Sequence, residues 1–266
     1  MLHGNDPEFL HQMRVGLRRL RSALRAFRKL VPRDKAKPLA GRLEKLMPFL
    51  GIARDWDVFC DGLARMAATE AGAAPAMRRL LAKARGRRAS ARHAARKAVA
   101  SPAFQAFMLR SLRWLQEEPW KKRAPRTGGS LARFGAAALG RLHRKALREA
   151  RGFDWRDSRR RHRLGIRVKR LRYASDFFAP CFARASAQPY LKRLQALQDI
   201  LGELNDVAVA RRLLAALAPR GSEPEISAAA RHARHAFAAR EGTLIASLEQ
   251  AWRPFEKRPP FWRPAE

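Results

Sequence analysis

The first part of the chain recurs 151 residues further on, and this internal repeat constrains the fold more than any other feature. Residues 11–21 (HQMRVGLRRLR) align with residues 162–172 (HRLGIRVKRLR), so the offset is 162 − 11 = 151. The same offset pairs Ala23 with Ala174, Phe27 with Phe178, Arg42 with Arg193, Leu43 with Leu194, Leu46 with Leu197, Leu50-Gly51 with Leu201-Gly202, Asp55 with Asp206 and Val58 with Val209. The repeat predicts two similar bundles that meet face to face in a pseudo-twofold relation.

The composition of the chain favours helices over strands. Ala and Leu dominate the apolar residues, whereas Val, Ile, Thr and Tyr are scarce. Capping signals such as Asp6-Pro7 and Ser101-Pro102 mark helix starts. We expect an all-α fold with helices over about 7–31, 36–51, from 55, from 75, 102–118, 131–151, 159–178, 188–202, 206–217 and 224–252. The segment 119–130 (PWKKRAPRTGGS) is the best candidate for a linker between the repeats.

The chain carries a large positive charge. Its 266 residues include 57 Lys or Arg and 23 Asp or Glu, which gives a formal net charge of +34. Because 47% of the residues are hydrophobic, the charge does not indicate disorder. Such an excess repels itself in the compact state, and a polyanionic partner would offset that repulsion. Nucleic acid, anionic lipid and polyphosphate all fit this requirement.

The sequence shows no sign of a metal site, a cofactor, a disulfide framework or a membrane span. Cys60 and Cys181 lie far apart and form no CxxC pair, and a reduced cytoplasmic compartment is the simple interpretation. The N-terminus lacks an apolar signal core, and no run reaches the ~18 apolar residues of a membrane helix. The histidines outside the repeat show no metal-ligand spacing.

The first predicted helix carries a continuous row of cations, which we call the basic ridge. Its members follow spacings of 3, 4, 3, 4 and 3 and are His11, Arg14, Arg18, Arg21, Arg25 and Arg28. The ridge flanks an apolar stripe made of Met13, Leu17, Leu20, Leu24, Phe27 and Val31. A merely solvated face usually mixes Glu with Lys, whereas this one is nearly all Arg. Because the guanidinium fork matches phosphate oxygens, the ridge indicates a phosphate chain as ligand.

The second copy of the ridge is thinner. It retains His162, Lys169 and Arg172, but Gly165 replaces the first Arg and Asp176 stands where the first copy has Arg25. We therefore expect the first repeat to carry more of the binding. Arg19 and Arg170 repeat faithfully but lie off the ridge, and two alternatives stay open for them. They either pair with Asp55 and Asp206 or line the phosphate site from another angle.

Three carboxylates near the repeat have two interpretations. Asp55, Asp57 and Asp206 could take part in acid–base chemistry or Mg²⁺ binding. The simpler interpretation makes Asp55 and Asp206 the N-caps of helices that begin after Gly51 and Gly202. A further basic tract from Arg78 to Lys97 either extends a polyanion track or forms a solvated helix face.

At these residues the sequence resembles the CHAD family, the conserved histidine α-helical domain. The resemblance is carried by His11-x-x-Arg14-x-x-x-Arg18-Arg19-Leu20-Arg21, Leu50-Gly51-x-x-Arg54-Asp55, Lys169-Arg170-Leu171-Arg172-Tyr173, Leu201-Gly202-x-Leu204-Asn205-Asp206 and Pro259-Pro260-Phe261-Trp262. It implies a single domain over 6–262, made of repeat 1 (about 6–118) and repeat 2 (about 131–262). Each repeat would form a four-helix bundle. It also implies binding of inorganic polyphosphate in a basic channel between the bundles, in the cytoplasm and at polyphosphate granules.

The residues that we expect to bind polyphosphate come from the ridge, its second copy and matched positions of the repeat. They are His11, Arg14, Arg18, Arg19, Arg21, Arg25, Arg28, Arg42, His162, Lys169, Arg170, Arg172 and Arg193. The triphosphate tunnel domain fused to many family members has an alternating-acid signature that this chain lacks, which predicts a stand-alone binding module.

Polyphosphate binding without catalysis is the first prediction, and other functions remain as alternatives. A nonspecific nucleic-acid-binding protein held by phosphate contacts is the main one. The six Trp do not interleave with the basic ridge, which argues mildly against base stacking. An enzyme acting on polyphosphate and a phosphotransfer role for His11 or His162 are further alternatives. The oligomeric state cannot be inferred from the sequence.

Overall fold

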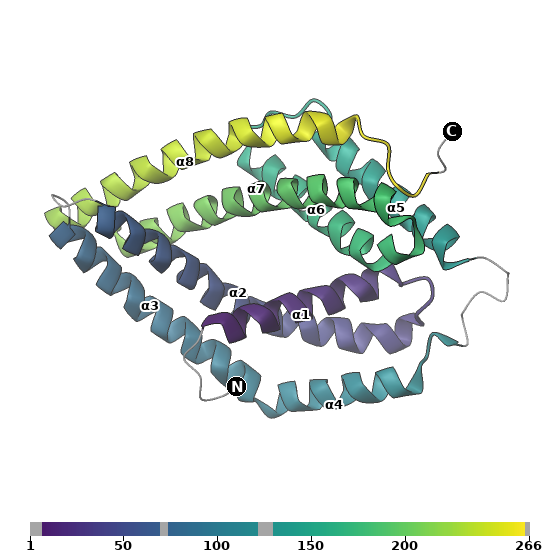
Figure 1. Ribbon diagram of the computed structural model, residues 1–266. Helices are drawn as coiled ribbons and strands as arrows, with labels where there is room; N and C mark the ends of the chain where they lie inside the picture. The colour runs from purple at the N-terminus through teal and green to yellow at the C-terminus, as the bar shows by residue number, and fades with distance from the viewer. Residues whose placement is uncertain (1–6, 70–73, 122–129, 264–266) are drawn as a thin grey trace. The chain divides into compact units, whose positions relative to one another are not determined.

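The structure is a computed structural model that describes residues 7–69, 74–121 and 130–263. The described part contains helices and no strand (Figure 1). In chain order they are α1 (Pro7–Ala26), α2 (Arg33–Thr69), α3 (Ala74–Ala100), α4 (Pro102–Glu117), α5 (Leu131–Ala150), α6 (Ser158–Phe178), the 3-10 helix η2 (Ala179–Cys181), α7 (Arg184–Leu217) and α8 (Pro224–Glu256). The all-α prediction is confirmed. The expected cap at Asp6 and most of the expected linker lie outside the described residues.

Two predicted helix breaks are wrong. α2 passes through Gly51 and Asp55, and α7 passes through Gly202 and Asp206, without interruption. A glycine inside a helix costs only about 1 kcal/mol, which tertiary packing can outweigh. In α2 the buried stripe Leu43, Leu50, Ala53, Leu63 keeps its helical phase on both sides of Gly51. The two aspartates are therefore interior helix residues and not N-caps.

The helix starts that rest on clear capping chemistry agree with the sequence. Ser101 precedes Pro102, and its hydroxyl accepts a hydrogen bond from the Phe104 amide at 3.3 Å. Ser130 caps α5 in the same way. These side chains satisfy backbone donors that the first helical turn leaves free.

Helix starts recur at nearly the offset of the sequence repeat. α1 and α6 begin at residues 7 and 158, and α2 and α7 begin at residues 33 and 184, which are both 151 apart. α3 and α8 begin at residues 74 and 224, a difference of 150. The repeat thus extends to element boundaries, while the division into two repeats and their twofold relation stay predictions.

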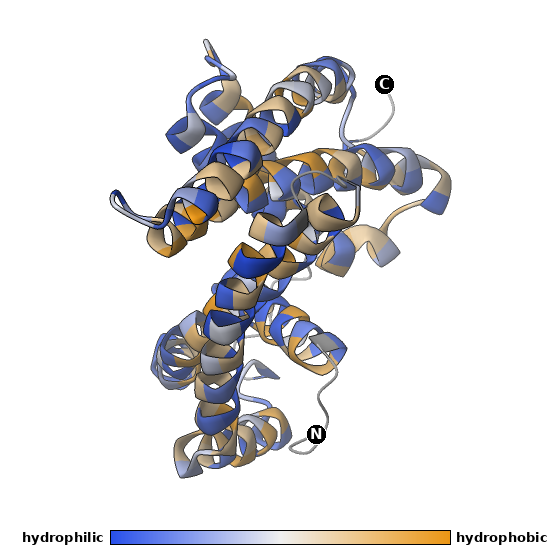
Figure 2. Cartoon of the chain, turned by 90° about the vertical axis from the view of Figure 1, so that its left-hand side faces the viewer, coloured by the Kyte–Doolittle hydropathy of each residue, from blue (hydrophilic) through white to orange (hydrophobic). Residues whose placement is uncertain are grey.

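By contacts, the chain forms two compact units that do not follow the order of the sequence. Unit 1 comprises Met1–Arg18, Arg33–Pro119 and Asp206–Arg240, and unit 2 comprises Arg19–Pro32, Trp120–Asn205 and Glu241–Glu266. α1, α7 and α8 each run through both units. Polar and apolar residues alternate around the helices (Figure 2), as expected for helices that bury one stripe.

Each unit has its own apolar core. In unit 1, α2 packs along α3, and the rings of Phe59 and Phe237 lie 6.4 Å apart. In unit 2, α5 packs along α6, and the ring of Tyr190 contacts those of Phe255, Phe261 and Trp262. The segment after α8 is therefore fixed by aromatic packing.

Candidate functional site

The first half of α1 brings three of the expected cations together in unit 1. His11, Arg14 and Arg18 stand at i, i+3 and i+7 on one helix face, and all three are half-buried. Arg54 on α2 adds a third arginine, close to His11. We call these four residues the α1 cluster. The buried Leu17 beside it anchors this stretch of α1, so the cluster is held in place by core packing.

The α1 cluster contains buried polar atoms that lack a hydrogen-bond partner. Among the described residues, His11 Nδ1, Arg14 Nε and Arg18 Nε are buried without one. Arg170 Nε, in unit 2, is in the same condition. Leaving such a group unsatisfied typically costs about 1–3 kcal/mol. All four atoms belong to residues that were predicted from the sequence to bind an anion, whereas Asp57 Oδ2 and Ser175 Oγ, which are also buried without a partner, do not. The oxygens of a bound anion would satisfy the arginine donors.

The environment of His11 favours its neutral form. Burial lowers the pKa of His11, and the nearby charges of Arg54, Arg18 and Arg14 lower it further, while Glu8 opposes them. Burial also lowers the pKa of Arg14, with Arg18 adding to the effect. Asp55 and Asp206 oppose this lowering of the Arg14 pKa, so the cluster keeps its arginines close together with partial compensation by two carboxylates.

The carboxylates near the cluster have structural partners. Asp55 Oδ2 forms an ion pair with Arg212 Nη2 at 3.9 Å. Burial is the main reason why the pKa of Asp55 is raised. Arg14 lowers that pKa, whereas Asp206 adds to the rise. Asp57 is buried and contacts Arg92 Nη2 at 2.6 Å. Asp57 is thus part of a structural ion pair between α2 and α3.

In the second copy of the ridge, on α6, the side chains of His162 and Arg172 are engaged by other residues of the protein. His162 Nδ1 lies 3.2 Å from Asn205 Oδ1. Arg172 donates to Gln198 Oε1 at 2.5 Å and to Asp176 Oδ2 at 3.0 Å, and it lies over the Tyr173 ring. The expectation that the first repeat carries more of the binding stays a prediction.

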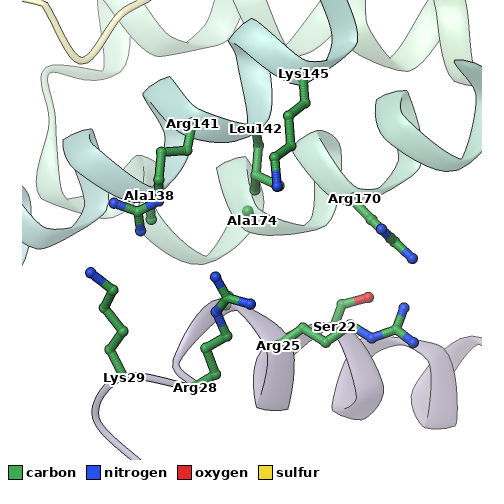
Figure 3. Close-up of a pocket in the computed structure, with 11 residues that line it drawn as sticks. Ser22, Arg25, Arg28, Lys29, Ala138, Arg141, Leu142, Lys145, Arg170 and Ala174 are labelled. Carbon is green, nitrogen blue, oxygen red and sulfur yellow. The ribbon is translucent and has the colours of Figure 1, made fainter. Parts of the chain in front are cut away.

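Several of the remaining expected residues gather around a pocket of about 320 Å³ in unit 2 (Figure 3). Arg25, Arg28 and Arg170 line it, together with Lys29, Arg141 and Lys145. Arg170 lies near Arg25, Arg167 and Arg21, which lower its pKa in addition to burial. The nearest charges of Arg170 are therefore cations, which fits the alternative in which it lines an anion site.

Three expected residues lie in other settings. Arg19 is exposed, and its positive charge lowers the pKa of the nearby Asp176, which burial raises. Arg42 makes a long contact, 3.5 Å, to the Ala103 carbonyl at the start of α4. Arg193 is exposed on α7. The acid that Arg19 is shown to influence is therefore neither of the two considered from the sequence.

The sequence reasoning missed four cations of these sites, namely Arg54, Lys29, Arg141 and Lys145. Arg54 stood within the quoted family motif but was not selected. Arg141, Lys145 and Arg148 follow the spacing i, i+4, i+7, which was the available signal for a second basic row on α5.

Metal ligation and membrane insertion find no support in the described part of the chain. There, no group of three or more His, Cys, Asp or Glu side chains could hold a metal ion. No described helix combines the length and apolar character that crossing a membrane requires.

Comparisons with known proteins give one family and two similar structures. A family model described as the CHAD domain matches residues 1–215. The crystal structure of the CHAD domain from the plant Ricinus communis has 35% identity and a TM-score of 0.78, over 97% of this chain and 84% of that chain. PptA from Streptomyces chartreusis has 19% identity and a TM-score of 0.69, over 95% and 92%, and shows the fold alone. No curated protein sequence matches the chain.

Proposed function

The chain belongs to the CHAD family, and from this premise we propose that it binds inorganic polyphosphate and catalyses no reaction on it. The family is associated with polyphosphate, which supports the ligand class. A basic channel formed by both repeats and association with polyphosphate granules in the cytoplasm belong to the same proposal and rest on the family resemblance.

The observation that carries the proposal is the set of buried atoms without partners in the α1 cluster. Arg14 and Arg18 each keep a buried Nε without an acceptor among the described residues. The stretch of α1 from Phe9 to Ala26 contains no acid, and the carboxylates near Arg14, Asp55 and Asp206, belong to other helices and only partly offset the positive charge. A polyphosphate chain supplies acceptor oxygens and a dense row of negative charge, so it would satisfy these donors and relieve the repulsion.

The tryptophans favour polyphosphate over single-stranded nucleic acid. Single-strand binders use exposed aromatic side chains for base stacking. Here Trp56, Trp252 and Trp262 are buried, and Trp114, Trp120 and Trp155 are half-buried. No tryptophan is fully exposed, and the exposed phenylalanines Phe9 and Phe49 provide few aromatic surfaces for stacking, so phosphate contacts would have to supply most of the binding.

Competition tests the ligand class. Fluorescent long-chain polyphosphate is bound at about 150 mM salt, a condition that weakens nonspecific phosphate contacts, and is then challenged with RNA or duplex DNA. We expect little displacement at equal phosphate concentration. Efficient displacement by nucleic acid would favour the alternative function. Incubation with polyphosphate and Mg²⁺ should release no phosphate.

Charge reversal tests the site. The double variant Arg18→Glu/Arg21→Glu should abolish polyphosphate binding while the helical circular dichroism signal is retained. The matched control Arg85→Glu/Arg87→Glu changes the net charge equally on the exposed face of α3 and should bind nearly as well as the wild type. Similar losses in both variants would mean that total charge, and not the basic ridge, determines the binding.

A further inference from the structure

Two packed helices of unit 2 carry facing rows of cations. α5 and α6 run antiparallel, since Glu149 at the end of α5 contacts Arg163 near the start of α6. α5 presents a row at i, i+4 and i+7, and α6 presents one at the same spacing. The rows are Arg141, Lys145, Arg148 and Arg163, Arg167, Arg170. Seven residues of helix extend over about 10 Å, so each row is longer than a single phosphate.

A groove lies between these rows. It has a volume of about 470 Å³ and is lined by Lys145, Arg148, Glu149, Arg160, Arg163 and Arg167, which we call the α5–α6 groove. Lys145 also lines the 320 Å³ pocket of Figure 3, so cations line both hollows. The groove itself uses none of the residues expected from the sequence to bind polyphosphate.

Three arginines of the groove are held in position by neighbouring groups. Arg160 donates to the carbonyls of Gly152 at 2.9 Å and Arg151 at 3.2 Å. Arg163 Nε and Arg167 Nε donate to the two oxygens of Glu149, at 2.8 and 3.4 Å. Each contact uses only part of the five N–H donors of a guanidinium, which leaves the others for a ligand. Cations that are already ordered lose less entropy when they bind.

The charge of the groove is unbalanced. Five cations face one carboxylate, and the hydrogen bond from Arg163 is the main reason why the pKa of Glu149 is lowered, so Glu149 is ionised at neutral pH. The net charge of the lining is therefore +4. A simple solvated face would leave its arginines unrestrained, whereas here one acid and two carbonyls order three of them.

We propose that the α5–α6 groove is a separate binding site for a short chain of linked phosphates, either an inorganic oligophosphate or the phosphate tail of a nucleoside triphosphate. Cations on both helices, with the three arginines of α6 held in position, match a linear anion with charge on both sides better than a single phosphate. The inference goes beyond the proposed function, because it uses none of the α1 cluster and names a shorter ligand.

Calorimetric titration with sodium tripolyphosphate and with ATP tests this site, without divalent cations and at an ionic strength of about 0.1 M. The titrations are made in an Arg14→Ala/Arg18→Ala background, which removes two of the three arginines of the α1 cluster. Adding Arg148→Ala/Arg163→Ala should weaken binding about tenfold or more, since each change removes charge-assisted hydrogen bonds to phosphate oxygens. The matched pair Arg144→Ala/Arg159→Ala, exposed on the same helices and outside both hollows, should change it less than about twofold.

Each outcome decides the proposal. Equal weakening by both pairs, or no saturable binding of either ligand, overturns it. Loss with the groove pair alone supports it, and the ligand that binds more tightly identifies the source of the chain. Because Arg163 also holds Glu149, Arg148→Glu provides a second groove variant if the pair fails to fold. The assignment of long-chain polyphosphate to the α1 cluster fails separately, if the background variant keeps the wild-type affinity for that ligand, and the proposed function itself fails if the wild type does not bind it.

Discussion

The protonation of His11 should depend on whether an anion occupies the α1 cluster. Burial and the charges of Arg54, Arg18 and Arg14 lower the pKa of His11 in the free protein. Bound phosphates would raise it again, so binding should take up a proton, and affinity should rise as the pH falls from 8 to 6. Because one pKa unit corresponds to a tenfold change, we expect the wild type to gain about 3- to 10-fold more affinity than His11→Gln over this range.

Titration calorimetry in buffers of different ionisation enthalpy measures this proton uptake directly. The wild type should take up more protons per bound chain than His11→Gln, while ionisation of the polymer itself contributes equally to both. Identical pH profiles for the two proteins would show that His11 does not sense the ligand.

His143 makes a different prediction, about stability. It is 6% exposed on α5, with Nδ1 2.9 Å from the Tyr190 hydroxyl. Burial lowers its pKa to about 4, with Arg263 and Arg144 contributing. Between pH 6.5 and about pH 4, His143 is protonated in the unfolded chain but neutral in the folded chain. The free energy of unfolding should therefore fall on acidification. The shift corresponds to a loss of about 2 kcal/mol between pH 7 and pH 5.

Urea unfolding of the wild type and His143→Gln at pH 7 and pH 5 measures this loss. The variant should lose clearly less stability than the wild type, because an amide does not titrate. His11, whose pKa is also lowered, contributes equally to both proteins and cancels in the comparison. Parallel losses would mean that His143 is not the group responsible.

Among the helices, two glycines with opposite surroundings predict opposite effects of the same substitution. A Cβ at Gly135 of α5 would lie 2.8 Å from Cδ1 of the fully buried Phe178. Gly86 of α3 is exposed, with no described heavy atom within 4 Å of such a Cβ. Gly135→Ala should therefore cost about 1–3 kcal/mol, whereas Gly86→Ala should stabilise by about 0.5–1 kcal/mol. Thermal or urea unfolding distinguishes them, and stabilisation of both would contradict the close packing of α5 on α6.

The helices also show how far local sequence signals reach. Ser101-Pro102 was predicted correctly because a cap and its proline act within one helical turn. The breaks expected at Gly51 and Gly202 were wrong because the stability of α2 and α7 comes from stripes buried along their whole length. A local cost of about 1 kcal/mol carries no information about such packing.

For the molecule as a whole, the site could be predicted only where one helix creates it. The basic ridge follows from spacing within α1. The engagement of His162 by Asn205 and of Arg172 by Gln198 depends on α7, which no spacing within α6 reveals. The α5–α6 groove needs two helices in contact at a particular register. The sequence therefore identified which helices carry charge, and packing determined which charges stay available.

The net charge of +34 predicts that salt stabilises this protein. Many of its ion pairs, such as Arg113 with Glu117 and Arg253 with Glu249, are exposed and contribute little. Screening shortens from about 10 Å at 0.1 M to about 3 Å at 1 M, so added NaCl should remove more repulsion than attraction. The melting temperature should rise by about 2–4 °C for each kcal/mol of repulsion removed.

Long-chain polyphosphate at constant ionic strength should raise the melting temperature as well, since it binds the folded state. Arg85→Glu/Arg87→Glu, which lowers the net charge by four, should respond less to salt. A melting temperature that falls with NaCl would mean that ion pairs outweigh the repulsion, and a polyanionic partner would then have no net repulsion to offset.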